Sequence, residues 1–360
     1  MSSNFSFGGD GSIEHVRLDT RTGGKWVTCT VITKQYVLLG YDDDVGLVQI
    51  DLASGRVSGR YQGEIRDSVR AMALVPGSSK LIVACADGKL LRFDVEDRSH
   101  ERTVQHASVG WSQLIVLSES NIAGVDDKGK LYVIDVRSLQ ITSTAAGAGF
   151  VDCYATDTAT GTLWCGGRSP SIGTYQWNGA ELQHVRSFEF DADGTQAFTG
   201  LHYCPATSAL FILSERGYLA VMKKLPDGGL TLCFDWDFED WCYFVQATSR
   251  DLAFTTRESG ALKFNKQDLI EGNRVLTRRQ KNRSEGRIGL SPSHLFYVDD
   301  ETDYMMGCLL DRTGRAEDLR LFEVGRADLT CLEWNEFGLV ACANTDDVWL
   351  LSRNSLTEQL

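Results

Sequence analysis

The chain has 360 residues, 42% of them hydrophobic, and carries a net charge of −13 at pH 7. This acidic excess argues against attraction of the whole protein to nucleic acid or to an anionic membrane surface. No apolar stretch is long enough to span a bilayer, and residues 1–11 lack the apolar run of a signal peptide. We therefore expect no membrane insertion and an intracellular location, either cytoplasmic or nuclear.

A strand–turn–strand phrase recurs along the chain. Each copy has an apolar strand, a polar or glycine-containing turn, and a second strand of alternating polarity. The copies are Val37–Asp51, Leu81–Asp94, Asn121–Asp135, Leu210–Lys223, Leu252–Asn265 and Leu339–Leu351. A repeat of this kind at a fixed period predicts an all-β fold, a closed β-propeller.

A further strand is expected just before each phrase. The expected starts lie about 40 to 48 residues apart, which is the spacing of four-stranded blades. They are Trp26, Val69, Trp111, Phe150, Phe198, Trp241, Arg287 and Leu329. This spacing predicts eight blades in one domain over residues 12–357, with tails at 1–11 and 358–360. Seven blades is the alternative, because residues 286–324 form the least regular unit.

The last repeat contains only three expected strands before the chain ends, within residues 329–351. Residues 12–19 alternate polar and apolar side chains, as a half-exposed strand does. We expect this N-terminal strand to complete the last blade, because that pairing would close the ring without an open sheet edge.

Two of the repeats end in dipeptides that resemble the Trp-Asp of the WD-repeat family, Phe93-Asp94 and Ile134-Asp135. The resemblance covers most of residues 12–357, although no Gly-His dipeptide opens a repeat. The Trp236-Asp237 dipeptide also falls outside the expected strand end. An unrelated propeller family is the alternative. The resemblance implies that the loops entering each blade lie on one face, around the mouth of a central channel, and that partner proteins dock there.

Large or basic side chains stand at comparable places near the starts of several blades. These residues are Trp26, Arg70, Trp111, Phe150, Trp241 and Arg287. Under the resemblance they would form a ring around the channel mouth, and exposed Trp and Arg are typical of interface hot spots. The alternative is that they pack between blades.

An aromatic and acidic run, Phe234–Phe244, leads into the sixth blade. In it Phe234, Trp236 and Phe238 alternate with acids. One interpretation is a strand with a buried aromatic face and a solvated acidic face. The other is an acidic pocket in which Trp236 helps to bind a basic peptide through cation–π contacts.

Residues 274–287 form the strongly basic segment of the chain. We interpret it either as a solvated loop or as a docking patch for an acidic peptide or a phosphate. Its candidate binding residues are Arg278, Arg279, Lys281, Arg283 and Arg287. One basic loop on an acidic body does not predict sequence-specific binding of nucleic acid.

Residues 133–137 resemble the box by which WD-repeat substrate receptors dock on the cullin-4 ubiquitin-ligase adaptor. Asp135 and Arg137 match that box, while Ile134 replaces its Trp. A substrate receptor of such a ligase is therefore one alternative function. In the other interpretation Asp135 stabilises its turn and Arg137 is a surface charge.

Motifs for catalysis and for metals are missing from the sequence. There is no GxSxG, HExxH, P-loop or dinucleotide fingerprint, and the ten cysteines include no CxxC pair. His202 and Cys204 resemble half of a zinc site without a second half. We expect reduced cysteines, no catalytic residue, no metal and no cofactor; a propeller hydrolase with a channel site is the second alternative. The sequence thus predicts a non-catalytic scaffold or adaptor that binds other proteins as a subunit of an intracellular complex.

Overall fold

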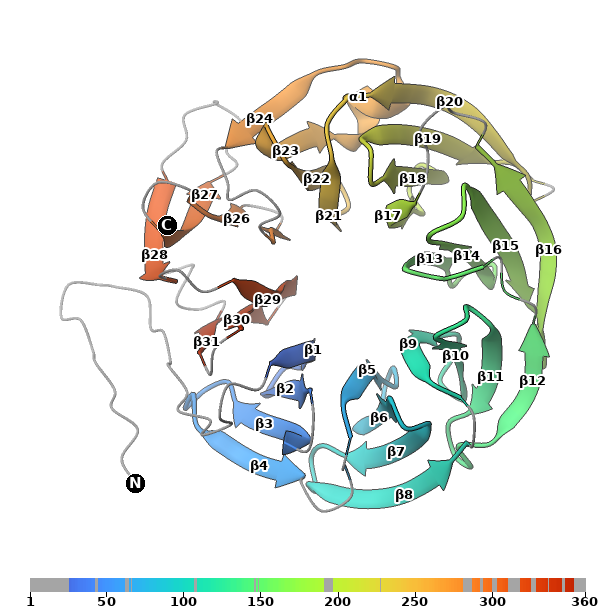
Figure 1. The fold of residues 1–360 in the computed structure, drawn as a ribbon, viewed down its shortest axis with the longest axis vertical. Coiled ribbons are helices and arrows are strands. Elements are labelled where there is room, and N and C mark those ends of the chain that lie inside the picture. Colours follow the sequence, from blue (N-terminus) through green and yellow to red (C-terminus); the bar gives the residue numbers. More distant parts are fainter. Residues whose placement is uncertain are drawn as a thin grey trace.

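The computed structural model describes residues 26–352, apart from residues 43–44, 62–64, 66, 107–108, 146, 148, 191–196, 227, 281–286, 292–293, 300–302, 310–317, 325–327, 336 and 345–346. These residues form eight antiparallel sheets that follow one another around a ring (Figure 1). The prediction of an eight-bladed propeller is confirmed, and the alternative count of seven is wrong.

The first four blades each have four strands in sequential order. Blade 1 contains β1 (Val27–Ile32), β2 (Tyr36–Tyr41), β3 (Leu47–Asp51) and β4 (Val57–Tyr61). Blade 2 contains β5 (Val69–Leu74), β6 (Lys80–Cys85), β7 (Lys89–Asp94) and β8 (Ser99–Gln105). Blade 3 contains β9 (Trp111–Val116), β10 (Asn121–Asp126), β11 (Leu131–Asp135) and β12 (Ile141–Ala145). Blade 4 contains β13 (Cys153–Asp157), β14 (Thr162–Gly166), β15 (Ser171–Trp177) and β16 (Leu182–Glu189).

The other four blades continue the ring. Blade 5 contains β17 (Phe198–Cys204), β18 (Ala209–Ser214), β19 (Tyr218–Lys224) and β20 (Leu230–Asp237). Blade 6 contains β21 (Cys242–Ala247), β22 (Asp251–Thr256), β23 (Gly260–Asn265) and β24 (Leu276–Gln280), with the helix α1 (Lys266–Ile270) before β24. Blade 7 contains β25 (Gly289–Leu290), β26 (His294–Val298), β27 (Tyr304–Leu309) and β28 (Asp318–Glu323). Blade 8 contains β29 (Leu329–Asn335), β30 (Gly338–Ala343) and β31 (Val348–Ser352).

The position of a strand within its blade explains its composition. The first strand of each blade lies nearest the middle of the ring and the fourth lies at the rim (Figure 1). Second strands are covered by the neighbouring blades on both faces, so β18 is buried throughout its length and is apolar except for Ser214 at its end. The rim strand β8 is exposed at nearly every position, and its sequence is correspondingly polar.

The hydrophobic core lies between neighbouring blades, and the last interface closes the ring. Val27 and Tyr41 of blade 1 pack in one cluster with Val340 and Val348 of blade 8. The expected strand at residues 12–19 lies outside the described residues, so its pairing with blade 8 stays a prediction. α1 has five residues, and none of the helices in the described ranges could cross a membrane.

A β-bulge recurs near the start of the first strand in six blades. In four of them the bulged residue is Ser or Thr, and its hydroxyl donates to a carbonyl of the second strand. The pairs are Thr28 with Gly40, Ser112 with Val125, Thr199 with Leu213, and Thr330 with Cys342. Because a bulge bends its strand and increases the local twist, we expect it to twist the inner strand of these blades near its start.

Candidate partner-binding face

The segments that lead into the first strands all lie at one end of the ring, because every blade has the same strand order and direction. We call this end, with the turns that join second to third strands, the loop face. Three large aromatic side chains are exposed on it: Trp26 at 53%, Phe150 at 48% and Trp241 at 38%. The structure therefore brings these three predicted residues to one accessible face.

Trp26 and Trp241 occupy the same structural position in blades 1 and 6. The N–H of Asp42 donates to the carbonyl of Trp26 at 2.8 Å, and the N–H of Arg257 donates to that of Trp241 at 2.9 Å. Each bond ties the segment to the turn of its own blade. The backbone that carries both indoles is consequently fixed before any partner arrives.

Trp111 does not belong to the exposed set, which corrects its assignment to a partner-binding ring. In blade 3 the position of Trp26 is taken by Gly110, whose carbonyl accepts from Asp127 N–H at 2.8 Å. Trp111 is one residue further along, and side chains of successive strand residues point to opposite faces. It is 2% exposed, and its Nε1 donates to the carbonyl of Gly88 at 3.0 Å. Packing between blades, the alternative interpretation, describes it correctly.

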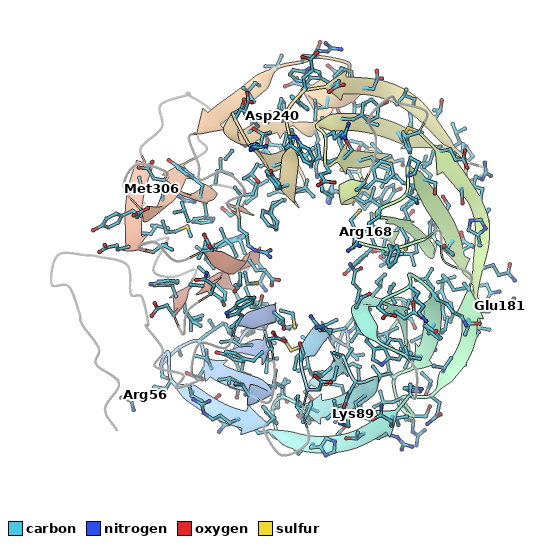
Figure 2. All side chains as sticks on the ribbon, in the orientation of Figure 1. Arg56, Lys89, Arg168, Glu181, Asp240 and Met306 are labelled. Atoms are coloured by element: carbon cyan, nitrogen blue, oxygen red, sulfur yellow. The ribbon has the colours of Figure 1, made fainter. Side chains whose placement is uncertain are left out.

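Two of the exposed aromatic rings carry an arginine. The guanidinium of Arg168 lies 5.1 Å from the ring centroid of Phe150, and that of Arg216 lies 5.9 Å from that of Trp241. Arg168 also reaches the carboxylate of Asp152 at 3.6 Å, and it stands at the inner edge of blade 4 (Figure 2). Exposed contacts of this kind contribute about 0.5–1 kcal/mol, enough to orient the side chains while leaving N–H donors for a ligand.

Arg70 occupies the bulge position of blade 2, where four other blades place a hydroxyl that bonds to the sheet. Its side chain is exposed. An arginine side chain at this position would have to fold back on the sheet to form the hydrogen bond that the hydroxyl forms in the other blades. Its exposure is consistent with the predicted role in binding.

The basic segment is partly a strand. Residues 276–280 form β24, so the interpretation of 274–287 as a loop is wrong for that part. The backbones of Arg278 and Arg279 pair with Lys263 and Leu262. The side chains of these two arginines, and all of residues 281–286 with Lys281 and Arg283, lie outside the described part of the chain.

The aromatic run has the predicted alternation, and a cation of the same chain already covers it. Phe234 is buried in β20, Trp236 is partly buried, and Asp235 and Asp237 are exposed. Asp240, later in the run, is buried. The guanidinium of Arg274 lies 5.9 Å from the ring centroid of Phe234 and 5.4 Å from that of Trp236. The cation–π position that the pocket interpretation reserved for a basic peptide is therefore occupied internally.

Asp135 and Arg137 differ in what the fold uses them for. Asp135 accepts from the N–H and the hydroxyl of Ser138, both at 2.6 Å, and these bonds lower the pKa of its carboxyl despite partial burial. The side chain of Arg137 is exposed. Asp135 thus stabilises its turn, and docking on a ligase adaptor through Arg137 stays a prediction.

His202 is paired with a lysine that the sequence did not single out. Its Nε2 lies 2.7 Å from Nζ of Lys266, a buried residue at the start of α1, which also donates to the carbonyl of Thr248. Burial and the neighbouring ammonium lower the pKa of His202 to about 4, and burial lowers that of Lys266 to about 8. Across the described ranges no three His, Cys, Asp or Glu side chains are placed to hold a metal ion.

Searches with the sequence match no family model and no curated protein. Solved structures do match. The β-propeller domain of Cps50 (Swd1) from Myceliophteria thermophila covers 82% of this chain and 97% of its own, with a TM-score of 0.57. The computationally designed protein Ika8 covers 91% and 96% with a TM-score of 0.72. BamB from Moraxella catarrhalis covers 95% and 99% with a TM-score of 0.69.

Each of these three structures is 13% identical to the chain in sequence. Identity at this level carries information about the fold and none about the ligand. Together with the strand order, the matches establish that this protein is an eight-bladed β-propeller.

Proposed function

We propose that the protein is a divergent WD-repeat scaffold, a non-catalytic subunit of an intracellular complex that docks a partner protein on the loop face. The observation that carries the proposal is the exposure of Trp26, Phe150 and Trp241 on that face, two of them beneath an arginine. Trp and Arg are enriched at the centres of interfaces, where each anchor fills a desolvated pocket of the partner.

The rigidity of the loop face supports this proposal. Hydrogen bonds within the blades fix the backbone at Trp26 and Trp241 in the free protein. Association then loses little backbone entropy, and only the rotamers of the anchors must be fixed. Covering the remaining exposed half of one such side chain contributes about 1 kcal/mol, so three anchors contribute a useful part of a micromolar interaction.

The WD-repeat assignment is supported by what Asp94 and Asp135 do. Asp94 accepts from the N–H groups of Glu96 and Asp97, each at 2.9 Å, and Asp135 accepts from that of Ser138. In both blades an acid at the end of the third strand holds the turn that follows. A short acidic side chain is suited to this role because it accepts backbone bonds two or three residues ahead.

Affinity purification from the native cell at two salt concentrations tests the proposal, with mass spectrometry of the bound proteins. The variant Phe150→Ala with Trp241→Ala should lose a partner that the wild type retains. The matched control is Val185→Ala with Leu232→Ala, which removes side chains that are each 50% exposed on the rim strands. Retention of every partner by the loop-face variant, or recovery of the wild type alone, would contradict the proposal.

The basic segment supplies a second test of partner binding. Replacing Arg278 and Arg279 together with Glu should weaken one partner and leave the melting temperature nearly unchanged, because the change reverses two charges on a rim strand. Equal capture of all partners by this variant would mean that the segment is a solvated face. Replacing Arg137 tests the ligase alternative in the same way, with the cullin-4 adaptor as the protein to be recovered.

A further inference from the structure

Arg287 differs from the other arginines of the loop face because part of its guanidinium is buried. It lies two residues before β25, at the first strand of blade 7, and its side chain is only partly exposed. Its Nε is buried and has no hydrogen-bond partner. Among the described residues none forms an ion pair with it. A guanidinium keeps its charge and five N–H donors, so this arrangement leaves a strong donor unused.

The surroundings hold this guanidinium in place from one side. It lies 4.3 Å from the ring centroid of Phe244 in blade 6, the shortest cation–π distance among the described residues. Phe244 belongs to the bulged part of β21, which leaves the ring partly exposed at the inner edge of its blade. The aromatic face positions the cation without consuming any of its N–H donors.

Blade 8 places a carboxyl group nearby that does not neutralise Arg287 by contact. Glu333 on β29 attracts the guanidinium, but its own oxygens are engaged elsewhere. The hydroxyl of Thr30 and the thiol of Cys331 both bond to this carboxyl, the thiol at 3.8 Å. Burial raises the pKa of Glu333.

Glu333 lies on β29, the strand of blade 8 nearest the middle of the ring. Tyr154, an exposed residue on the first strand of blade 4, has a raised pKa, mainly through desolvation and partly through the charge of Glu333. Blades 4 and 8 stand on opposite sides of the ring (Figure 1). Arg287 lies just before the first strand of blade 7, and its side chain is partly exposed there.

We propose that Arg287 anchors a binding site for a monovalent carboxylate at the inner edge of blades 6, 7 and 8. The planar fork of a guanidinium matches a carboxylate with two parallel hydrogen bonds. A phosphate dianion would fit the fork as well, but one arginine balances one negative charge. The second charge of a phosphate would find no further positive charge in the Arg287 guanidinium. The site therefore selects a carboxylate over a phosphate.

Side-chain NMR of the ¹⁵N-labelled full chain tests the site directly. The Nε–H signal of Arg287 is assigned as the signal that Arg287→Lys removes. Titration with sodium acetate at constant ionic strength should shift this signal in a saturable way. Sodium chloride should not shift it, and phosphate should saturate at a higher concentration than acetate. Absence of a shift with acetate, or an equal shift with chloride, would overturn the proposal.

A second variant keeps the test valid if Arg287→Lys fails to fold. Glu333→Gln replaces the buried carboxyl with a neutral amide and retains the Arg287 signal. In this variant acetate should still saturate at a lower concentration than phosphate, because the single positive charge of Arg287 sets the preference. Tighter binding of phosphate than of acetate by this variant would overturn the selection for a monovalent ligand. The variant Phe150→Ala with Trp241→Ala should bind acetate normally, so failure of the loop-face proposal would leave this one standing.

The same signal identifies the source of the carboxylate. A capped tripeptide with a central Glu presents the group as a partner protein would, and acetate presents it as a free acid. Tighter binding of the peptide than of acetate assigns the site to an acidic side chain of a partner. Tighter binding of acetate assigns it to a small carboxylic acid. Either order supports the site, and binding of neither overturns it.

Discussion

The buried ion pair between blades 4 and 5 allows the strength of one blade interface to be measured. Lys224 at the end of β19 reaches Asp157 at the end of β13, with 2.7 Å between Nζ and Oδ2. Its Nζ also donates to the hydroxyls of Thr160 at 2.6 Å and Thr162 at 3.0 Å. It lies 5.4 Å from the ring centroid of Trp164. Every donor of the ammonium is thus engaged inside the interface.

Lys224→Met removes the charge and keeps an apolar stem of similar length. Asp157 then stays buried with the hydroxyl of Thr160, at 2.7 Å, as a remaining donor. Removing one partner of a buried pair costs 3–5 kcal/mol in typical cases, and the retained donor places this one near the lower end, about 3 kcal/mol. The control Asp157→Asn with Lys224→Met leaves no buried charge and should be within about 1–2 kcal/mol of wild type.

The pKa of Asp157 determines whether the stability lost by Lys224→Met grows or shrinks with pH. Burial alone would raise the pKa of Asp157, but hydrogen bonds from Lys224 and Thr160 outweigh it, so the folded-state pKa is lowered. The pair therefore contributes stability above the unfolded pKa and loses it as the pH falls. In Lys224→Met burial prevails, the pKa of Asp157 rises, and folding is penalised as the pH rises. The deficit of the variant should grow from about pH 4 to pH 7.

Urea unfolding followed by tryptophan fluorescence at both pH values measures this deficit. The reasoning would be refuted if Lys224→Met costs less than about 1 kcal/mol at pH 7, the level of an exposed pair. It would also be refuted if the deficit is equal at the two pH values, or if the double variant is as unstable as the single one.

Three further predictions concern packing, ring closure and thiol reactivity. Gly124→Ala would place a Cβ 2.5 Å from Cζ3 of Trp111, so thermal unfolding should show a loss of about 1–3 kcal/mol; an unchanged melting temperature would contradict this close packing. Deleting residues 1–19 should lower the melting temperature more than deleting the tail before residue 12, if residues 12–19 complete blade 8; equal effects would exclude that pairing. Cys233 is exposed and Cys153 is buried with a raised pKa, so a thiol reagent should label the first in native protein and the second only after unfolding. Labelling of Cys153 in the native protein as fast as that of Cys233 would contradict the fold of blade 4.

The blade count and most strand positions could be predicted because each repeat has the same local pattern of apolar strands and polar turns. The expected starts at Val69, Trp111, Phe198 and Leu329 coincide with the first residues of their strands. The largest error in a start is at Phe150, three residues before β13. The connection there contains glycines, which have a flexible backbone and no side chain. They interrupt the alternation of polar and apolar residues that marks a strand.

The candidate site could be predicted less well, because exposure depends on register at the level of one residue. Trp26 and Trp111 look equivalent in the sequence, but one stands before its strand and the other inside it. Contacts between residues that are distant in the sequence could not be predicted either. Arg274 contacts Trp236 and Lys266 contacts His202 across 38 and 64 residues of sequence, and no local pattern indicates either pair.

The interface between blades 8 and 1 has a consequence for biosynthesis. The hydroxyl of Thr30 contacts the thiol of Cys331 across 301 residues, and the amide of Asn335 donates to the carbonyl of Ile32 across 303. At translation rates of about 5–20 residues per second, the apolar flank of the first blade stays uncovered for roughly 15–60 s, until blade 8 has been synthesised. During that interval the nascent chain exposes this apolar surface on an incomplete ring, and we expect chaperones at the ribosome to bind it.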